Sequence, residues 1–356
     1  MNRIKKLVNY FFTGYSFLAS KKVIAVLELA LFIALLDVST GYQEELKRKE
    51  TEMMTLTEDK NIKVYQNNSD SSIPETAMNS LVKCYKEKLE EKDYTEEIKK
   101  YIESLENLYK ENGEHFSFLY QDIYSGFTIS YNEDSPIFTA SSIKAPAMIY
   151  LYEEASKGKI DLKEKLTYTP NFYHSGSGIL QTKPQNTSYE VGELIKYAVI
   201  ESDNIAYAML MNRFGRENAL NFWKEKNTSY IFTLDTIWGV TCTKDASIYM
   251  NELYKFYQEN DTYGKELMGY FKSATWKLIT DKDGKFNTAN KGGWSGVAIH
   301  DIAIVYDKNP YILAIMSNTG ESNYPYLFNN TSKLVGNLHN EYWKQKEKKC
   351  SSIKLY

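Results

Sequence analysis

The alternation of hydrophobic and polar residues predicts strands near both ends of the chain and helices between them. Apolar side chains recur every three or four residues over 95–111, which is typical of an amphipathic helix, with Thr95 as its N-cap. Residues 115–134 contain two strand-like runs around Tyr124-Ser125-Gly126, a hairpin pattern. Over 142–256 helical periodicity dominates and is broken only by loops.

Strand patterns return near the C-terminus. Residues 297–307 and 311–319 flank Lys308-Asn309-Pro310 as a second hairpin, and a helical pattern covers 327–343. Strands from both ends can pair in one sheet while the middle helices pack as a second layer. We therefore predict an α+β fold, with an antiparallel sheet flanked by helices, an all-helical lobe, and an active site in the cleft between them.

The most hydrophobic stretch lies near the N-terminus, at residues 23–38. Its 16 residues would span roughly 24 Å as a helix, slightly less than the ~30 Å core of a bilayer. Lys21 and Lys22 precede it, and Glu44 and Glu45 follow it. Because basic flanks stay in the cytoplasm, we expect a cytoplasmic N-terminus and an exported body.

The same stretch has two other interpretations. No small-x-small site follows it, so an uncleaved anchor is favoured over a cleaved signal peptide. Glu28 near its middle is costly in a bilayer and favours the alternative of a buried helix in a soluble protein.

These patterns divide the chain into five parts. Residues 39–93 are polar and charged, with few large apolar side chains to bury, which predicts a stalk. The parts are a cytoplasmic basic segment at 1–22, a membrane anchor or signal at 23–38, a stalk or linker at 39–93, the folded domain at 94–345 and a tail at 346–356.

Composition narrows the classes of function. The 43 basic and 46 acidic residues give a net charge of −3, which argues against a nucleic-acid partner. The 4 histidines show no metal-ligand spacing, so we expect neither a metal nor another cofactor. The 3 cysteines exclude a disulfide-rich scaffold and a Cys-pair zinc site. Whether Cys84 pairs with Cys242 or with Cys350 stays open.

Ser141-Ser142-Ile143-Lys144, an S-x-x-K motif, opens an apolar helical segment. Positions three apart share one helix face, so the Ser141 hydroxyl and the Lys144 amine would lie close together. A neutral amine can take the proton of a serine and make it a nucleophile. Alone, the motif is more typical of a capped surface helix than of a catalytic site, because Ser and Lys are common residues.

Two further short motifs follow. Ser202-Asp203-Asn204 comes after an apolar helical pattern, where a serine can relay a proton and an amide can hold a substrate carbonyl. Lys291-Gly292-Gly293 precedes the second hairpin, where small residues let a substrate backbone approach and a lysine attracts a carboxylate. By themselves these motifs are typical of a helix cap and a turn.

Taken together, S-x-x-K, S-D-N and K-G-G stand in one order, separated by 61 and 89 residues. This arrangement resembles the penicillin-recognising serine hydrolases, specifically the branch of class A β-lactamases and penicillin-binding proteins. The resemblance covers about Tyr94 to Trp343. It includes residues 173–181, which look like the substrate-side loop, and 241–256, which look like the helix after the active-site loop.

The resemblance implies catalytic roles for three residues. Ser141 would be the acylated nucleophile, Lys144 its proton acceptor and Ser202 a proton relay. Substrate binding would involve Asn204, Lys291, Gly293 and Ser295. Lys291 would orient a substrate carboxylate, and the oxyanion hole would use the Ser141 N–H with an N–H near Ser295.

The sequence departs from the family pattern at two places. Gly292 stands where the family has a Thr or Ser hydroxyl that helps bind the substrate carboxylate. The family also holds its deacylating water with a Glu in an E-x-x-L-N loop. We expect no such pattern between Asn204 and Lys244, and in residues 228–246, where that loop would lie, Asp235 is the only acid before Asp245. Without that base, which supplies ~10²–10⁴-fold, we expect slow deacylation.

The resemblance, together with the N-terminal hydrophobic segment, therefore predicts a membrane-anchored, extracytoplasmic serine acyl hydrolase. Its partners would be a β-lactam or a peptidoglycan peptide of the D-Ala-D-Ala type, and the membrane through the N-terminal segment. The alternative is a catalytically weak module that binds cell-wall fragments or β-lactams and signals through the anchor. Gly292 and the missing Glu favour that alternative, whereas the intact Ser141 and Lys144 argue against it.

Overall fold

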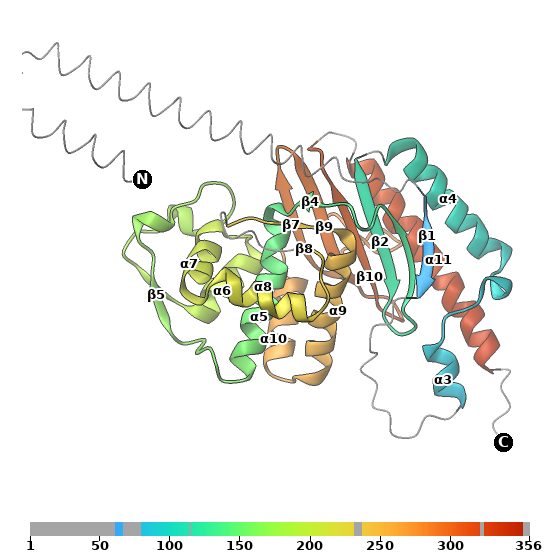
Figure 1. Ribbon diagram of the computed structural model, residues 1–356, viewed down its shortest axis with the longest axis horizontal. Coiled ribbons are helices and arrows are strands. Elements are labelled where there is room, and N and C mark those ends of the chain that lie inside the picture. Colours follow the sequence, from blue (N-terminus) through green and yellow to red (C-terminus); the bar gives the residue numbers. More distant parts are fainter. Residues whose placement is uncertain (1–60, 67–79, 114, 231–236, 321–323, 352–356) are drawn as a thin grey trace, which may run out of the picture. The chain divides into compact units, whose positions relative to one another are not determined.

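Six antiparallel strands form the central sheet, in the order β1-β3-β2-β10-β9-β8 (Figure 1). The computed structural model describes residues 61–66, 80–113, 115–230, 237–320 and 324–351. The strands are β1 (Lys63–Gln66), β2 (Phe116–Asp122), β3 (Phe127–Tyr131), β8 (Thr288–Ser295), β9 (Ala298–Val305) and β10 (Tyr311–Ser317). Because β10 pairs with β2 along its whole length, strands from the two ends of the chain meet in one sheet, as predicted.

Helices cover both faces of this sheet (Figure 1). Along β10, Tyr311, Leu313 and Ile315 join the hydrophobic cluster beneath α4 (Glu96–Asn112) and α11 (Tyr324–Ser351). The alternate residues of β10, Ile312, Ala314 and Met316, join the cluster beneath the helical lobe. The strand is buried along its entire length because both faces are packed.

Local sequence signals place these elements accurately. The Thr95 hydroxyl accepts a hydrogen bond from the N–H of Ile98 and caps α4, as the pattern predicts. Both predicted hairpins are confirmed, as β2–β3 and as β9–β10. The last helix is longer than the predicted 327–343, since α11 continues to Ser351.

The helical lobe lies beside the β8 edge of the sheet (Figure 1). Its helices are α5 (Lys144–Ser156), α6 (Val191–Ile200), α7 (Asn204–Phe214), α8 (Arg216–Glu225), α9 (Thr243–Glu259) and α10 (Tyr263–Lys272). Two short antiparallel pairs complete it: β4 (Ile137–Phe138) with β7 (Val240–Thr241), and β5 (Lys165–Thr167) with β6 (Ser188–Glu190). This two-part arrangement is the predicted α+β fold.

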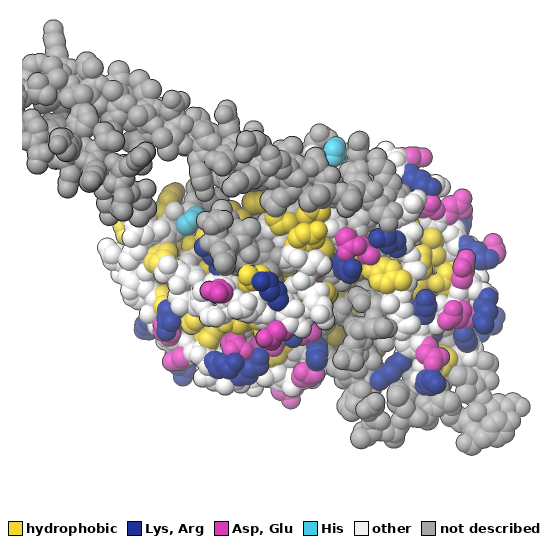
Figure 2. Space-filling model, viewed as in Figure 1, with side chains coloured by type: hydrophobic (Ala, Val, Ile, Leu, Met, Phe, Trp, Pro, Cys, Tyr) yellow, Lys and Arg dark blue, Asp and Glu magenta, His cyan; other side chains and the backbone are white. Residues whose placement is uncertain are grey.

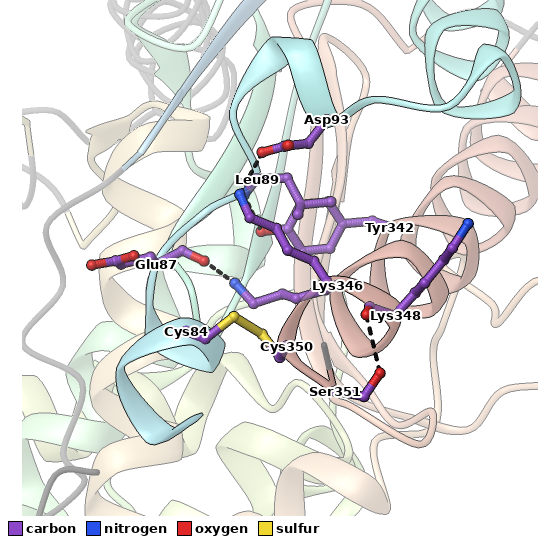
Figure 3. The surroundings of a disulfide bond; sticks show 10 residues. Cys84, Glu87, Leu89, Asp93, Tyr342, Lys346, Lys348, Cys350 and Ser351 are labelled. Atoms are coloured by element: carbon purple, nitrogen blue, oxygen red, sulfur yellow. Dashed lines mark hydrogen bonds and ion pairs between the residues drawn. A yellow bond between two sulfur atoms is a disulfide. The ribbon is translucent and has the colours of Figure 1, made fainter. Parts of the chain in front are cut away.

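Part of the segment expected to be a stalk belongs to this body. Strand β1 extends the sheet beside β3, and helix α3 (Ser80–Lys86) is bonded to α11 through the disulfide Cys84–Cys350 (Figure 3). The pairing left open by the sequence is thus Cys84 with Cys350, and Cys242 is a buried free thiol. Lys346 packs beside the disulfide and donates a hydrogen bond to the carbonyl oxygen of Glu87.

No helix in the described part of the chain is long and apolar enough to cross a membrane. The predicted anchor at residues 23–38 lies outside the described residues. On the face in view in Figure 2, basic and acidic side chains are interspersed rather than gathered by sign. This mixture agrees with the near-neutral net charge of the sequence.

Candidate active site

Ser141 lies in the short 3₁₀ helix η3 (Ala140–Ile143), which runs directly into α5. Lys144 is the first residue of α5, and its Nζ lies 2.9 Å from Ser141 Oγ. Ala140, just before the serine, has φ of 41°, a left-handed conformation that costs a residue with a Cβ of order 1 kcal/mol. The chain therefore makes a strained turn that presents Ser141 beside Lys144.

The Lys144 amine is enclosed by protein. It donates hydrogen bonds to the Ser202 carbonyl oxygen at 2.6 Å and to Asn204 Oδ1 at 2.7 Å. The rings of Tyr207 and Trp238 lie 6.0 and 5.5 Å from it. Burial, and then the positive charge of Lys291, lower the pKa of Lys144 well below its usual value. The site therefore favours a neutral amine, which can accept a proton.

Ser202 lies between α6 and α7 with φ of 52°, a second strained residue at this site. Its Oγ lies 3.2 Å from Lys144 Nζ and 2.9 Å from Lys291 Nζ. Asp203 holds the turn, because its carboxylate accepts hydrogen bonds from the N–H groups of Ile205 and Ala206 and caps α7. One hydroxyl thus connects two lysine amines.

Lys291 and Gly293 come from β8, at the edge of the sheet. Lys291 also donates to the carbonyl oxygen of Gly292 at 3.1 Å, and burial lowers its pKa to about 8. A Cβ on Gly293 would lie 2.8 Å from the backbone nitrogen of Ser142 and 2.9 Å from that of Ser141. Only glycine lets β8 approach the turn that carries Ser141 this closely.

His300 on β9 supports the strand that leads to Ser141. Its Nδ1 accepts a hydrogen bond from the N–H of Ser317, so its Nε2 donates to the carbonyl oxygen of Phe138, 2.6 Å away. Burial lowers the pKa of His300 to about 4, which keeps the ring neutral near pH 7. The imidazole therefore ties the core of the sheet to the segment before Ser141.

The loop at 173–181 closes another side of the site. Asn204 Nδ2 donates to the Ser175 carbonyl oxygen at 2.7 Å, and Ser177 Oγ donates to the Ser202 carbonyl oxygen at 2.7 Å. A Cβ on Gly178 would overlap the carboxyl group of Asp203. The loop is thus fixed against the second motif, and its Gly176 and Ser177 line the cleft that opens beside it.

A cleft of about 590 Å³ opens over these groups. Six of the seven residues singled out in the sequence line it: Ser141, Ser202, Asn204, Lys291, Gly293 and Ser295. The seventh, Lys144, lies behind Ser141 and is fully buried. Ser295 is at the end of β8, where its hydroxyl accepts a weak hydrogen bond from the N–H of Val297 at 3.3 Å.

The cleft also contains residues that the sequence reasoning did not single out. Three tryptophans, Trp238, Trp276 and Trp294, line it together with Glu201 and Thr275. Tryptophan at three distant positions carries no local pattern, so these residues had no signal in the sequence. Glu201, next to the second motif, could have been noticed by its place beside Ser202 alone.

An E-x-x-L-N pattern does exist between Asn204 and Lys244, so the expectation that none lies there was wrong. Residues 217–221 read Glu-Asn-Ala-Leu-Asn, but they lie in helix α8. Glu217 is exposed in the first turn of α8 and is not among the residues that line the cleft. The pattern therefore does not supply a carboxylate to this site. Asp235 lies outside the described residues.

A family model for the β-lactamase enzyme family matches residues 93–341. No curated protein sequence matches the chain. Among solved structures, a point mutant of PBP-A, captured as an acyl-enzyme complex with penicillin G, superposes with a TM-score of 0.63 at 18% identity. That match covers 68% of this chain and 97% of the other.

Two β-lactamase structures show the same fold. The ancestral class A β-lactamase of the last common ancestor of Gram-negative bacteria has a TM-score of 0.57 and 17% identity, over 68% of this chain and 99% of its own. The β-lactamase from Sphaerobacter thermophilus DSM 20745 has a TM-score of 0.56 and 13% identity, over 70% and 95%. At such low sequence identity, these superpositions show a shared fold alone.

Proposed function

The chain belongs to the β-lactamase enzyme family, and we propose that it is a membrane-anchored serine acyl hydrolase that is acylated on Ser141. The substrates would be β-lactams or peptides of the D-Ala-D-Ala type. The observation that carries this proposal is the 2.9 Å contact between Ser141 Oγ and the buried Lys144 amine. A desolvated amine in contact with a serine hydroxyl is a suitable general base.

In the acylation step, neutral Lys144 accepts the proton of Ser141 as Oγ bonds to the substrate carbonyl carbon. The Ser141 N–H lies at the start of a helix, where N–H groups have no intrahelical acceptor. It would stabilise the oxyanion together with an N–H of β8 near Ser295. The scissile C–N bond then breaks as the nitrogen gains a proton.

That proton has a short route from Lys144 to the leaving nitrogen. Ser202 Oγ lies within 3.2 Å of Lys144 Nζ and lines the cleft, so it would give its own proton to the nitrogen and take one from the lysine. Lys291, 2.9 Å from the same oxygen, stabilises negative charge that develops on it. Asn204 would orient the substrate amide from the same side of the cleft.

Deacylation needs a base that activates water. Among the described residues that line the cleft, Glu201 is the only carboxylate, and no family-type Glu stands in residues 228–246. We therefore propose that the acyl-enzyme forms and is hydrolysed slowly. The acyl-enzyme of the PBP-A mutant with penicillin G supports penicillin as a probe of this chemistry.

The proposed location is outside the cytoplasm, with residues 23–38 as the anchor. The Cys84–Cys350 disulfide supports it, because such bonds persist in oxidising compartments and are rare in the cytosol. Fractionation of cells that express the full chain should recover it with membranes, and protease added to cells with a permeable outer layer should reach the folded domain. Recovery in the cytosol would refute export.

The experiment for the activity mixes the full chain with a chromogenic cephalosporin and follows the burst and the steady state. We expect a burst of one equivalent followed by slow turnover, and a mass increase on Ser141. The Ser141→Ala variant should show neither, with an unchanged fold by circular dichroism. Labelling that persists in the Ser141→Ala variant would reject the assignment of Ser141 as the nucleophile.

Two other outcomes have a defined meaning. Sustained turnover would reject slow deacylation and direct attention to Glu201, tested by Glu201→Gln. Absence of both burst and labelling would reject the hydrolase and favour the alternative, a binding module for cell-wall fragments or β-lactams. The observation in favour of this alternative is Gly292, which stands where the family has a hydroxyl that helps bind the substrate carboxylate.

A further inference from the structure

The indole of Trp276 occupies the space in which a side chain at position 292 would begin. A Cβ on Gly292 would lie 2.0 Å from two ring carbons of Trp276, Cε3 and Cζ3, and 3.3 Å from the carbonyl oxygen of His300. No Cβ can be accommodated unless the indole moves. The glycine in the third motif and the tryptophan, 16 positions earlier in the chain, therefore form one structural unit.

Hydrogen bonds on both sides fix this tryptophan. Asn290 Nδ2 on β8 donates to the Trp276 carbonyl oxygen at 3.3 Å. The backbone N–H and the hydroxyl of Thr275 both donate to the carbonyl oxygen of Ile200, at 3.0 and 2.9 Å, two residues before Ser202. These bonds fix the backbone of residues 275 and 276 between the second and third motifs, and the Trp276 side chain lines the cleft and is 37% exposed.

The charged residues of the cleft near Trp276 and Gly292 are poorly suited to binding a carboxylate. Of the described residues that line the cleft, Lys291 is the only cation and Glu201 the only anion. The Lys291 amine already donates to Ser202 Oγ and to the carbonyl oxygen of Gly292. A ligand carboxylate against the wall would meet one shared cation and an indole face in place of a hydroxyl donor.

We propose that Trp276 determines specificity, because its indole replaces a hydroxyl at position 292 and selects acyl donors whose leaving-group side is neutral and apolar. An indole face attracts flat or aliphatic groups through burial and dispersion. The one donor of the ring, Nε1–H, lies on the edge opposite Cε3 and Cζ3, so the part of the ring beside Gly292 offers no hydrogen bond to an anion. A carboxylate placed against this part of the ring would lose water without gaining a donor from it. The preferred acyl donors are therefore those in which the carboxylate on the leaving-group side is esterified or amidated.

This inference rests on the proposed acylation of Ser141 and narrows its substrate class. Its test compares benzylpenicillin, which has a free carboxylate, with benzylpenicillin methyl ester, which is neutral at the same position. The rate constant for acylation of Ser141 is measured by mass spectrometry for both compounds. The ratio of ester to acid, compared between variants, cancels the intrinsic reactivity of the two β-lactams.

The decisive variant combines Trp276→Ala with Gly292→Ser, which removes the indole and restores a hydroxyl in the freed space. The ester-to-acid ratio should fall about 10-fold relative to the unaltered chain. Trp276→Phe keeps a flat apolar wall and should keep the ratio. Trp294→Ala removes another tryptophan of the cleft, which does not cover Gly292, and should change both rate constants by the same factor.

An unchanged or increased ratio in the double variant overturns the inference while acylation of Ser141 still stands. If no variant is acylated, the hydrolase proposal fails, and the inference is then decided by binding. Calorimetry with Ser141→Ala measures the dissociation constants of acid and ester without chemistry. Tighter binding of the ester, lost on adding Trp276→Ala and Gly292→Ser, supports the inference, and equal or tighter binding of the acid rejects it.

Discussion

Lys291 Nζ donates a hydrogen bond to Ser202 Oγ at 2.9 Å, although the two residues are 89 positions apart in the chain. The same oxygen lies 3.2 Å from Lys144 Nζ. The positive charge of Lys291 therefore reaches both the hydroxyl and the second amine, and it is the second cause, after burial, of the lowered pKa of Lys144. The two lysines are thus coupled by charge and share one serine hydroxyl.

This coupling predicts a bell-shaped dependence of acylation on pH. As the pH falls through the lowered pKa of Lys144, the amine gains a proton and can no longer accept that of Ser141. As the pH rises above about 8, the pKa of Lys291, that residue loses its proton and Ser202 loses the charge beside it. Rate constants for acylation by benzylpenicillin between pH 5 and 10 should fall on both sides, at about 10-fold per pH unit at the extremes.

The Lys291→Gln variant separates this role from simple binding. Without the cation, the pKa of Lys144 rises, so the acidic limb should move to higher pH, and the alkaline limb should vanish. A profile of unchanged shape with uniformly lower rates would mean that Lys291 contributes to substrate binding alone.

Replacing Lys144 by methionine should leave the fold intact and slow acylation by ~10²–10⁴-fold, because the general base is removed while the apolar stem is kept. Single-turnover kinetics with the chromogenic cephalosporin measure this loss. Lys196→Met, on the exposed side of α6, is the matched control and should acylate at the normal rate. A near-normal rate of acylation of the Lys144→Met variant would refute the role of Lys144 as the general base.

The Gly293→Ala variant should lose acylation with little loss of secondary structure. Its Cβ would approach the backbone nitrogens of Ser141 and Ser142 to 2.9 and 2.8 Å, so the nucleophile turn must move. A displacement of this kind typically costs about 100-fold in rate. Gly296→Ala is the control, because nothing lies within 4 Å of its Cβ. Equal rates in both variants would show that this approach is not needed for catalysis.

The disulfide should stabilise the fold without serving the active site. It closes a loop of 266 positions between α3 and α11, and Cys350→Ser should lower the free energy of unfolding by about 2–4 kcal/mol. Reductant should lower the stability of the unaltered chain similarly and should not affect the variant, as denaturant titrations can measure. Cys242→Ser should keep the sensitivity to reductant. A stability that reductant leaves unchanged would contradict this role.

Local patterns were sufficient for most of the framework. The helix capped by Thr95 and the two hairpins follow from periodicity and turn residues, because these signals act within a few positions of the chain. The three motifs were visible for the same reason, each being a short run of letters. The E-x-x-L-N run at 217–221 shows the limit of short motifs as evidence for a site. It matches the family pattern, but it lies in helix α8 and does not line the cleft.

The sequence by itself determined the order of the elements and the α+β class, and it singled out the residues that we propose for acylation. Only the tertiary structure decided that Lys144 is buried against Ser202, that Cys84 pairs with Cys350, and that an indole fills the space above Gly292. Each of these features joins residues far apart in the chain. Burial, charge coupling and steric exclusion depend on distances in space, and those distances exist only after the two ends of the chain have met in one sheet.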